Sequence, residues 1–292
     1  MRVLITNDDG IRAPALTILA RALADAGHDV CVVAPLEGYS GCGASIGSVS
    51  EGHRIRIDPV DLAGAPGIAA FAVDSPPAFI VLAALQGRFG PRPDVVVSGP
   101  NSGLNLGPLV LHSGTLGAAV TAASNGVPAI ALSTEKRPRF GYETASQFCA
   151  RHLAGMLGAM GPAAALNINV PDLPLERIAG VRQTRLAPRS LVEIVLLDDA
   201  ASSADGGDAR LISQPSCSAL RNSPLGRPCG LMRIELEHDH DRSLHRQWRT
   251  TLDAPDDTDA GAIVDGYISI TMVHGGLRHV DGHDLLAAWQ PA

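Results

Sequence analysis

Two adjacent carboxylates near the start of the chain have the residue types and spacing to do chemistry. Asp8 and Asp9 stand in the run Asn7, Asp8, Asp9 and Gly10, directly after a short apolar segment. Adjacent carboxylates repel each other, so placing both at the end of a strand costs free energy unless a cation screens them. A hard divalent ion, Mg²⁺, Mn²⁺ or Ca²⁺, prefers such oxygen ligands. The run therefore predicts a divalent metal site; the alternative is a helix cap and a turn.

Two further polar loops follow apolar segments. One carries Ser40 and Gly41, and the other is the Gly-rich run SGPNSGLN at residues 98–105. In an open parallel sheet, ligands bind beyond the carboxyl ends of the strands, so we expect all three loops to meet at one edge. The hydroxyl and amide oxygens of these loops would complete an oxygen-rich metal shell.

A run of small residues, Ser113, Gly114 and Thr115, opens an expected helix. Unpaired N–H groups and the helix dipole make such a start an anion site, and the small residues let a ligand approach the backbone. The alternative is a Ser cap on a closely packed helix. His112, just before it, is either a proton donor to a leaving group or a structural residue.

Other phosphate chemistries are excluded by their motifs. The chain has no GxxxxGK[ST] loop and no GxSxG elbow. The GxGxxxG run at residues 41–47 lies in a long loop and does not open a helix at once, which argues against dinucleotide binding. Asp8 and Asp9 are adjacent, whereas aspartyl-phosphate phosphatases need one residue between the two. The HDHD run at residues 238–241 is interpreted as a solvated polar loop.

The elements that must position these loops alternate along the first part of the chain. Apolar strands are expected at residues 3–6, 29–34, 69–73, 94–98, 129–133 and 164–170. Helices are expected from Pro14 to the closing Gly27, and at residues 76–86, 113–124 and 142–160. This alternation predicts an α/β fold with a doubly wound, mostly parallel, Rossmann-like sheet.

The pattern changes after about residue 175. Strands at residues 181–186, 190–197, 231–237 and 266–272 follow without intervening helices, and residues 199–208 are typical of a mobile loop. We therefore expect a catalytic core over residues 1–175. Residues 176–292 are expected to form a C-terminal extension of β-hairpins that packs back on the core and serves oligomerisation.

The composition is that of a globular protein, with 46% hydrophobic and 18% charged residues. The net charge of −7 and the absence of a dense Lys/Arg run argue against a nucleic-acid duplex as partner. Five scattered cysteines without a CxxC pair indicate reduced thiols. The N-terminus reads as a strand, and no apolar run approaches the roughly 20 residues of a membrane span. The sequence predicts a soluble, cytoplasmic protein without membrane contact.

The motifs together resemble the SurE (stationary-phase survival protein) family of 5′/3′-nucleotidases. The segments that carry the resemblance extend over most of the chain: ITNDDGIRAPAL, the Ser40-Gly41 pair, DVVVSGPNSGLNLG, HSGTLGAAVTAASNGVPAIALS, ALNINVP and DTDAGAIVDGYISIT. The family dephosphorylates nucleoside monophosphates with a divalent metal, often Mn²⁺ or Mg²⁺. The resemblance implies a 5′-nucleotidase, acting also on 3′-monophosphates, with one such ion per subunit, in a homodimer or homotetramer.

The resemblance also assigns roles to residues. It implies a metal held by Asp8, Asp9, Ser40 and Asn101, with catalysis at Asp8 and Asp9 supported by Asn7. The phosphate contacts would fall on Gly41, Asn105, Ser113, Gly114 and Thr115.

Three segments depart from the family pattern, one of them the ITP near the end, which is Ile270-Thr271-Met272 here. The DRNxSG pattern is Leu36-Glu37-Gly38-Tyr39-Ser40-Gly41 here, and the GTPADCV segment is Asp74-Ser75-Pro76-Pro77-Ala78-Phe79-Ile80. The metal set is intact while neighbouring positions have changed. Two alternatives follow: a non-catalytic relative that binds metal or nucleotide, and a different hydrolase such as a nucleoside hydrolase.

Overall fold

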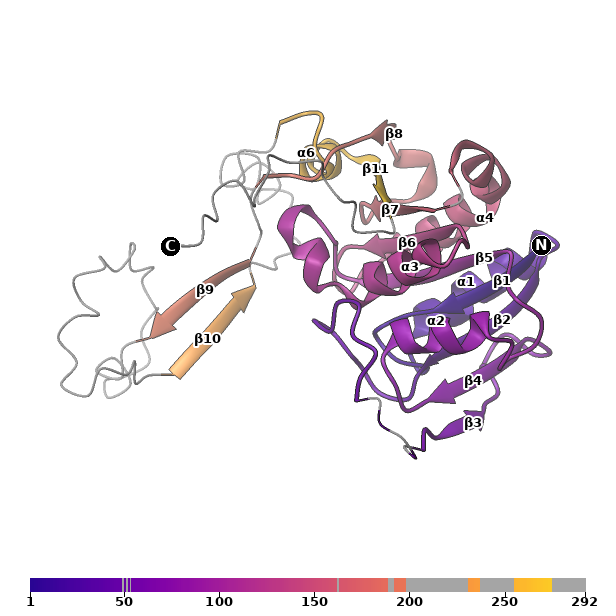
Figure 1. Cartoon of the computed structure of the whole chain (residues 1–292). Coiled ribbons are helices and arrows are strands. Elements are labelled where there is room, and N and C mark those ends of the chain that lie inside the picture. The colour runs from indigo at the N-terminus through magenta and orange to yellow at the C-terminus, as the bar shows by residue number, and fades with distance from the viewer. Residues whose placement is uncertain are drawn as a thin grey trace, which may run out of the picture. The chain divides into compact units, whose positions relative to one another are not determined.

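A nine-stranded sheet is the framework of the computed structural model, which describes residues 1–48, 50, 52, 54–161, 163–188, 192–197, 231–236 and 255–274. From one edge to the other (Figure 1), the strands are β3 (Ile57–Pro59), β4 (Ala69–Val73), β2 (Asp29–Pro35), β1 (Arg2–Thr6), β5 (Val95–Ser102), β6 (Ala129–Thr134), β7 (Ala164–Val170), β11 (Tyr267–His274) and β8 (Gly180–Gln183).

The six central strands, from β4 to β7, are all parallel. Strand β3 pairs antiparallel with β4, and β11 pairs antiparallel with β7. The chain runs outward from β1 through β2 to β4, returns to β5 beside β1, and then runs outward again through β6 to β7. The predicted doubly wound, mostly parallel Rossmann-like α/β fold is confirmed.

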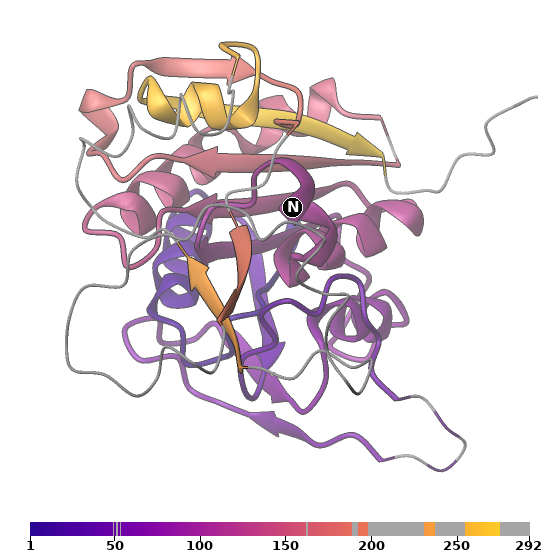
Figure 2. The same cartoon turned by 90° about the vertical axis from the view of Figure 1, so that its left-hand side faces the viewer.

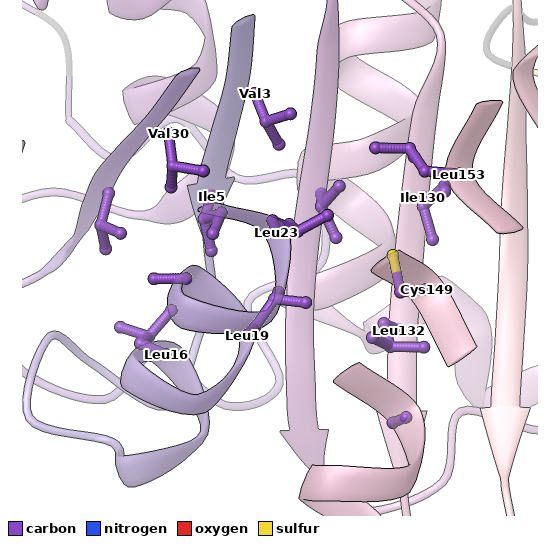
Figure 3. Close-up of a cluster of buried hydrophobic side chains, with 14 of the residues drawn as sticks. Val3, Ile5, Leu16, Leu19, Leu23, Val30, Ile130, Leu132, Cys149 and Leu153 are labelled. Carbon is purple, nitrogen blue, oxygen red and sulfur yellow. The ribbon is translucent and has the colours of Figure 1, made fainter. Parts of the chain in front are cut away.

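Helices cover both faces of this sheet. Helices α1 (Pro14–Asp25) and α4 (Gly141–Ala159) pack on one face, where Leu16, Leu19 and Leu23 meet the side chains of β1, as Figure 3 shows. Helices α2 (Pro77–Leu85) and α3 (Gly114–Ser124) pack on the other. The apolar spacing of α1 at every third or fourth residue is what turns one face inward. None of the described helices is long and apolar enough to span a lipid bilayer.

The chain after residue 175 contributes to the same sheet. After a 3₁₀ turn, η2 (Leu175–Arg177), strand β8 follows; the six-residue helix α6 (Asp259–Val264) precedes β11, and both views show these parts beside β7 (Figures 1 and 2). The chain divides into two compact units, residues 1–190 with 240–292, and residues 191–239. The boundary expected after residue 175 falls inside the first unit. The second unit contains the antiparallel pair β9 (Val192–Leu197) and β10 (Leu231–Leu236).

Several expected elements differ from the structure. Strand β3, helix α6 and the 3₁₀ helix η1 (Gly107–His112) were not expected, and the strand expected over residues 181–186 is only β8. Strand β5 continues four residues past Ser98, through an irregularity before Asn101. A Cβ at Gly99, whose φ is +122°, would collide with the Leu132 carbonyl, so glycine is required there. The expectations for residues 199–208 and 238–241 lie outside the described residues.

Candidate active site

The carboxyl ends of β1 and β5 form the topological switch point of the sheet. The chain leaves β1 toward one edge and leaves β5 toward the other, so the two following loops separate and open a crevice. Asp8 and Asp9 follow β1, and Asn101 and Ser102 end β5. The topology therefore brings the predicted metal ligands from two distant segments to one place.

Asp8 is buried at this point, with 4% of its surface exposed. Its Oδ1 accepts a hydrogen bond of 2.6 Å from the Thr115 hydroxyl, and its carbonyl accepts one of 2.7 Å from the Tyr39 N–H. Burial raises the pKa of Asp8 from 3.8 to about 6; the Thr115 hydroxyl opposes this shift and the neighbouring Asp9 charge adds to it. Its Oδ2 is left for a ligand.

Asp9 is held from the neighbouring strand. Its Oδ2 accepts a hydrogen bond of 3.0 Å from the backbone N–H of Ser102, and burial raises the pKa of its carboxyl. Among the described residues, neither Asp8 nor Asp9 forms an ion pair with a basic side chain. Two adjacent carboxylates are thus withdrawn from water without a protein cation to compensate them, which is the condition that a bound metal ion relieves.

Asn7 shapes the loop that carries the two carboxylates. Its fully buried side chain donates to the Gly10 carbonyl at 3.1 Å and accepts from the Gly10 N–H at 3.2 Å. Gly10 has a φ of +95°, a conformation that glycine adopts without strain. Both polar ends of the Asn7 amide are therefore engaged within the turn, and Asn7 fixes the backbone that carries the two carboxylates.

The start of helix α3 lies directly against Asp8. A Cβ at Gly114 would lie 2.7 Å from the Asp8 Cβ, 2.9 Å from its Oδ2 and 2.8 Å from the Cys42 sulfur. The Ser113 hydroxyl accepts a 3.1 Å hydrogen bond from the Leu116 N–H and so caps the helix. A Ser cap was the alternative to an anion site in the interpretation of this run. Of the residues predicted to bind phosphate here, Thr115 is bonded to Asp8 and Ser113 to its own helix.

The segment after β2 closes a third side. Tyr39 is bonded to Asp8, and the Gly43 N–H donates to the His112 carbonyl at 3.0 Å. Ser40 and Gly41, which stand between these anchors, are exposed. The His112 side chain is exposed as well. The structure thus places the predicted ligand Ser40 at the rim of the crevice that holds Asp8.

Asn101 and Asn105 hold different positions in the Gly-rich loop. Asn101 donates through its Nδ2 to the Gly103 carbonyl at 2.7 Å, which leaves its Oδ1 for a ligand. The backbone N–H of Asn105 donates to Asn169 Oδ1 at 2.8 Å, and its Nδ2 donates to Ser133 Oγ at 2.8 Å. Asn105 is therefore fixed over the carboxyl ends of β6 and β7.

Several residues of the site were not found from the sequence. The Asn105 carbonyl accepts from Asn167 and Asn169, two residues apart on β7, and a shared face for two amides in an apolar strand could have revealed them. The hydrogen bond from the Ser102 N–H to Asp9 could not be predicted from the sequence, because every residue except proline supplies a backbone N–H. The loop after β6 carries Lys136 and Arg137, and the Arg137 N–H donates to Ser102 Oγ at 3.2 Å.

The donor set fits a hard divalent ion. No group of three or more His, Cys, Asp or Glu side chains gathers in the described part of the chain, so a metal here must take neutral oxygens beside the two carboxylates. Asp8 Oδ2, Asp9 Oδ1 and Asn101 Oδ1 are the oxygens that their hydrogen bonds leave over. All three are hard ligands of the kind that Mg²⁺ and Mn²⁺ take.

Comparisons with known proteins identify the family of the chain. Residues 3–193 match the family described as Survival protein SurE. The chain is 33% identical to the "5'/3'-nucleotidase SurE" of Citrobacter koseri over 99% of this chain and 96% of that relative. It is 40% identical to the "5'-nucleotidase SurE" of Gloeobacter violaceus over 65% of this chain and 71% of that relative. The solved SurE protein from Aquifex aeolicus superposes with a TM-score of 0.68 at 26% identity and covers 95% of both chains.

Proposed function

The chain belongs to the SurE family, and we propose that it is a divalent-metal-dependent 5′-nucleotidase that hydrolyses nucleoside 5′-monophosphates, and 3′-monophosphates as well, to nucleoside and phosphate. The observation that carries the proposal is the uncompensated pair at the switch point, in which Asp8 is buried against the start of α3 and Asp9 is half-buried. The relatives named above are all nucleotidases, and nothing favours a non-catalytic role.

In this proposal Asp8, Asp9, Asn101 and Ser40 hold one Mg²⁺ or Mn²⁺ ion. The ion would polarise a phosphoryl oxygen and lower the pKa of a bound water. Side chains of the protein supply the proton acceptor and hold it in place. The carboxylate of Asp8 or of Asp9 would accept the proton that the attacking water gives up, and the Thr115 hydroxyl keeps Asp8 in one orientation.

The substrate phosphate would lie against Gly41, Asn105 and the start of α3. The first N–H groups of a helix and its dipole favour the negative charge that develops on the equatorial oxygens. Gly114 lets the start of α3 pack directly against Asp8 and Cys42, because a Cβ there would collide with both, and so keeps the anion site beside the metal site. Substrate choice would be set at the rim, where Glu37 and Tyr39 replace the family's usual residues.

The proposal is tested by measuring phosphate release from a panel of nucleoside 5′- and 3′-monophosphates and other phosphomonoesters, with Mg²⁺, with Mn²⁺ and with EDTA. We expect release from nucleotides that depends on metal and stops in EDTA. Free base in place of phosphate would identify a nucleoside hydrolase. Absence of phosphate release from every nucleotide, with metal bound at Asp8, would overturn the proposal.

Metal binding should compete with protonation of Asp8. Its pKa is about 6, and only the carboxylate binds metal, so protons displace the ion below that pH. Displacement of one proton predicts that the apparent affinity for Mn²⁺ falls about tenfold for each pH unit below about pH 6 and levels off above it. Calorimetric titration with Mn²⁺ across this range measures the slope. A flat profile would show that Asp8 is not a ligand.

We further propose a homodimer or homotetramer in the cytoplasm. The described cysteines Cys31, Cys42 and Cys149 are free thiols, which supports a reducing compartment. Light scattering of the full chain measures the oligomeric state.

A further inference from the structure

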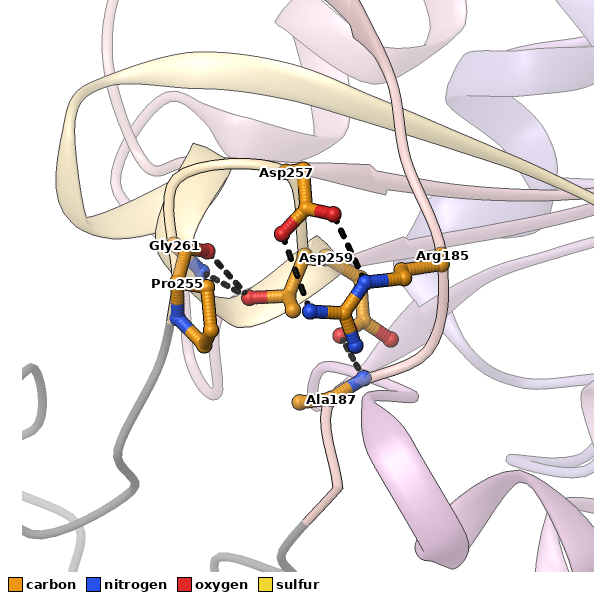
Figure 4. Close-up of polar contacts among 7 residues, drawn as sticks. Arg185, Ala187, Pro255, Asp257, Asp259 and Gly261 are labelled. Atoms are coloured by element: carbon orange, nitrogen blue, oxygen red, sulfur yellow. Dashed lines mark hydrogen bonds and ion pairs between the residues drawn. The ribbon is translucent and has the colours of Figure 1, made fainter.

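Asp259, at the start of α6, is a carboxylate with no exposed surface, and among the described residues it forms no ion pair with a basic side chain. Both of its oxygens accept hydrogen bonds from backbone N–H groups. Oδ1 accepts from Ala187 and from Ala260, each at 2.8 Å, and Oδ2 accepts from Gly107 at 2.9 Å (Figure 4 shows the Ala187 side). Three amide donors are what keeps a buried carboxylate tolerable.

The Gly107 bond reaches into the site. Gly107 begins η1, which leads directly to Ser113 and the start of α3. Two residues before it stands Asn105, fixed by Ser133 and Asn169. The hydrogen bond from Gly107 to Asp259 therefore fixes one point within residues 105–115, the segment whose two ends carry the proposed phosphate contacts.

We propose that Asp259 is a positioning residue: through Gly107 it sets the geometry of residues 105–115 that bind the substrate phosphate. The inference rests on the proposed phosphate site and reaches beyond the residues that touch the substrate. The side chain of Asp259 is hydrogen-bonded to the backbone of Gly107, Ala187 and Ala260 and to none of the candidate metal ligands, so its effect passes through the backbone.

Oδ1 of Asp259 accepts two hydrogen bonds and Oδ2 accepts one, so a substitution can remove the single bond to Oδ2 selectively. In Asp259→Asn the remaining oxygen is best placed at the Oδ1 position, where it keeps two bonds. The new NH₂ then faces the Gly107 N–H, donor against donor, and this one bond is lost. Asp259→Ala loses all three bonds, that of Gly107 included, and therefore does not separate positioning from stability.

Asp257 supplies the matched control. It lies two residues away and forms an exposed ion pair with Arg185 at 2.7 Å, on the same junction but without a bond to Gly107 (Figure 4). Asp257→Asn removes the same charge by the same change. We expect it to leave phosphate binding and turnover unchanged.

The test compares wild type, Asp259→Asn and Asp257→Asn well below their melting temperatures. Calorimetry in the presence of Mn²⁺ gives the dissociation constant of inorganic phosphate, and steady-state kinetics give kcat and KM. The third measurement is the rate of amide hydrogen exchange at Gly107. In Asp259→Asn we expect phosphate binding to weaken about tenfold and kcat/KM to fall by at least as much. Exchange at Gly107 should accelerate, while the affinity for Mn²⁺ alone stays at the wild-type value.

Faster exchange at Gly107 with unchanged phosphate affinity would overturn the inference and leave Asp259 a purely structural residue. Unchanged exchange would overturn it as well. Wild type that binds phosphate but hydrolyses no nucleotide would refute the proposed function and leave this inference standing on the binding data.

A measurement on the unmodified protein covers the case in which Asp259→Asn does not fold. Coupling between two sites is reciprocal, so phosphate bound to residues 105–115 must stabilise the Gly107 bond. Inorganic phosphate should therefore slow amide exchange at Gly107 in the wild type. If phosphate binds and the exchange rate stays the same, the two are not coupled and the inference is wrong.

Discussion

Replacing Asp8 with asparagine should lower kcat by about a thousandfold while the chain stays folded. Asparagine has the same shape, and its Oδ1 still accepts the hydrogen bond from Thr115 that holds Asp8 in place. What disappears is the charge that would hold the metal and the oxygen that would accept a proton. Steady-state phosphate release at saturating metal measures the loss.

The same variant should be more stable than wild type in EDTA. Burial raises the pKa of Asp8 from 3.8 to about 6, so ionising it destabilises the fold as pH rises through this window, by on the order of 3 kcal/mol. Asparagine does not ionise, so the difference in melting temperature should be largest above about pH 6 and vanish near pH 4. Asp25→Asn, at an exposed position, is the control. Wild-type turnover in Asp8→Asn would remove Asp8 from the mechanism.

Replacing Gly114 with alanine should reduce kcat/KM by about a hundredfold. The added methyl group would lie 2.7 Å from the Asp8 Cβ and 2.8 Å from the Cys42 sulfur, distances at which something must move. Either the start of α3 retreats from Asp8 or the carboxylate turns away from its Thr115 partner. Both changes separate the metal site from the anion site, and Mn²⁺ titration shows which side has moved.

Gly155→Ala is the matched control for this change. Gly155 lies within α4, and nothing surrounds its absent Cβ within 4 Å. There the methyl group favours the helix, and we expect a gain of roughly 0.5–1 kcal/mol with unchanged activity. Equal activity losses in the two variants would contradict a specific role for the contact between Gly114 and Asp8.

The sequence predicted the parts of this protein that depend on local pattern. Strands β4 and β7 have the predicted bounds, because continuous apolar runs between turn residues identify buried strands. The position of Asp8 and Asp9 after β1 was predicted as well, because it follows from the order of the elements along the chain. Asn101 could be placed at the same edge because parallel strands end together.

The remainder depended on contacts between distant segments. The Asp259 carboxylate bonds to Gly107, 152 residues away, and no local pattern contains that information. Helix α6 has only six residues, too few for a periodic signal. The role of Ser102 rests on a backbone N–H, and that of Gly114 on a missing side chain. The sequence therefore predicted the position of the two carboxylates better than the backbone groups that orient them.

The junction between β8 and α6 also has a consequence for how the chain can vary in length. Arg185 pairs with Asp257, and Ala187 is bonded to Asp259, so the points where the chain leaves after Pro188 and returns at Pro255 are tied together. Once the ends are joined, doubling the length of the connection costs only about 0.6 kcal/mol in closure entropy. The match to the SurE family ends at residue 193, close to this point. A chain with a different number of residues between Pro188 and Pro255 could therefore keep the same two anchor contacts, and with them the Gly107 bond of Asp259.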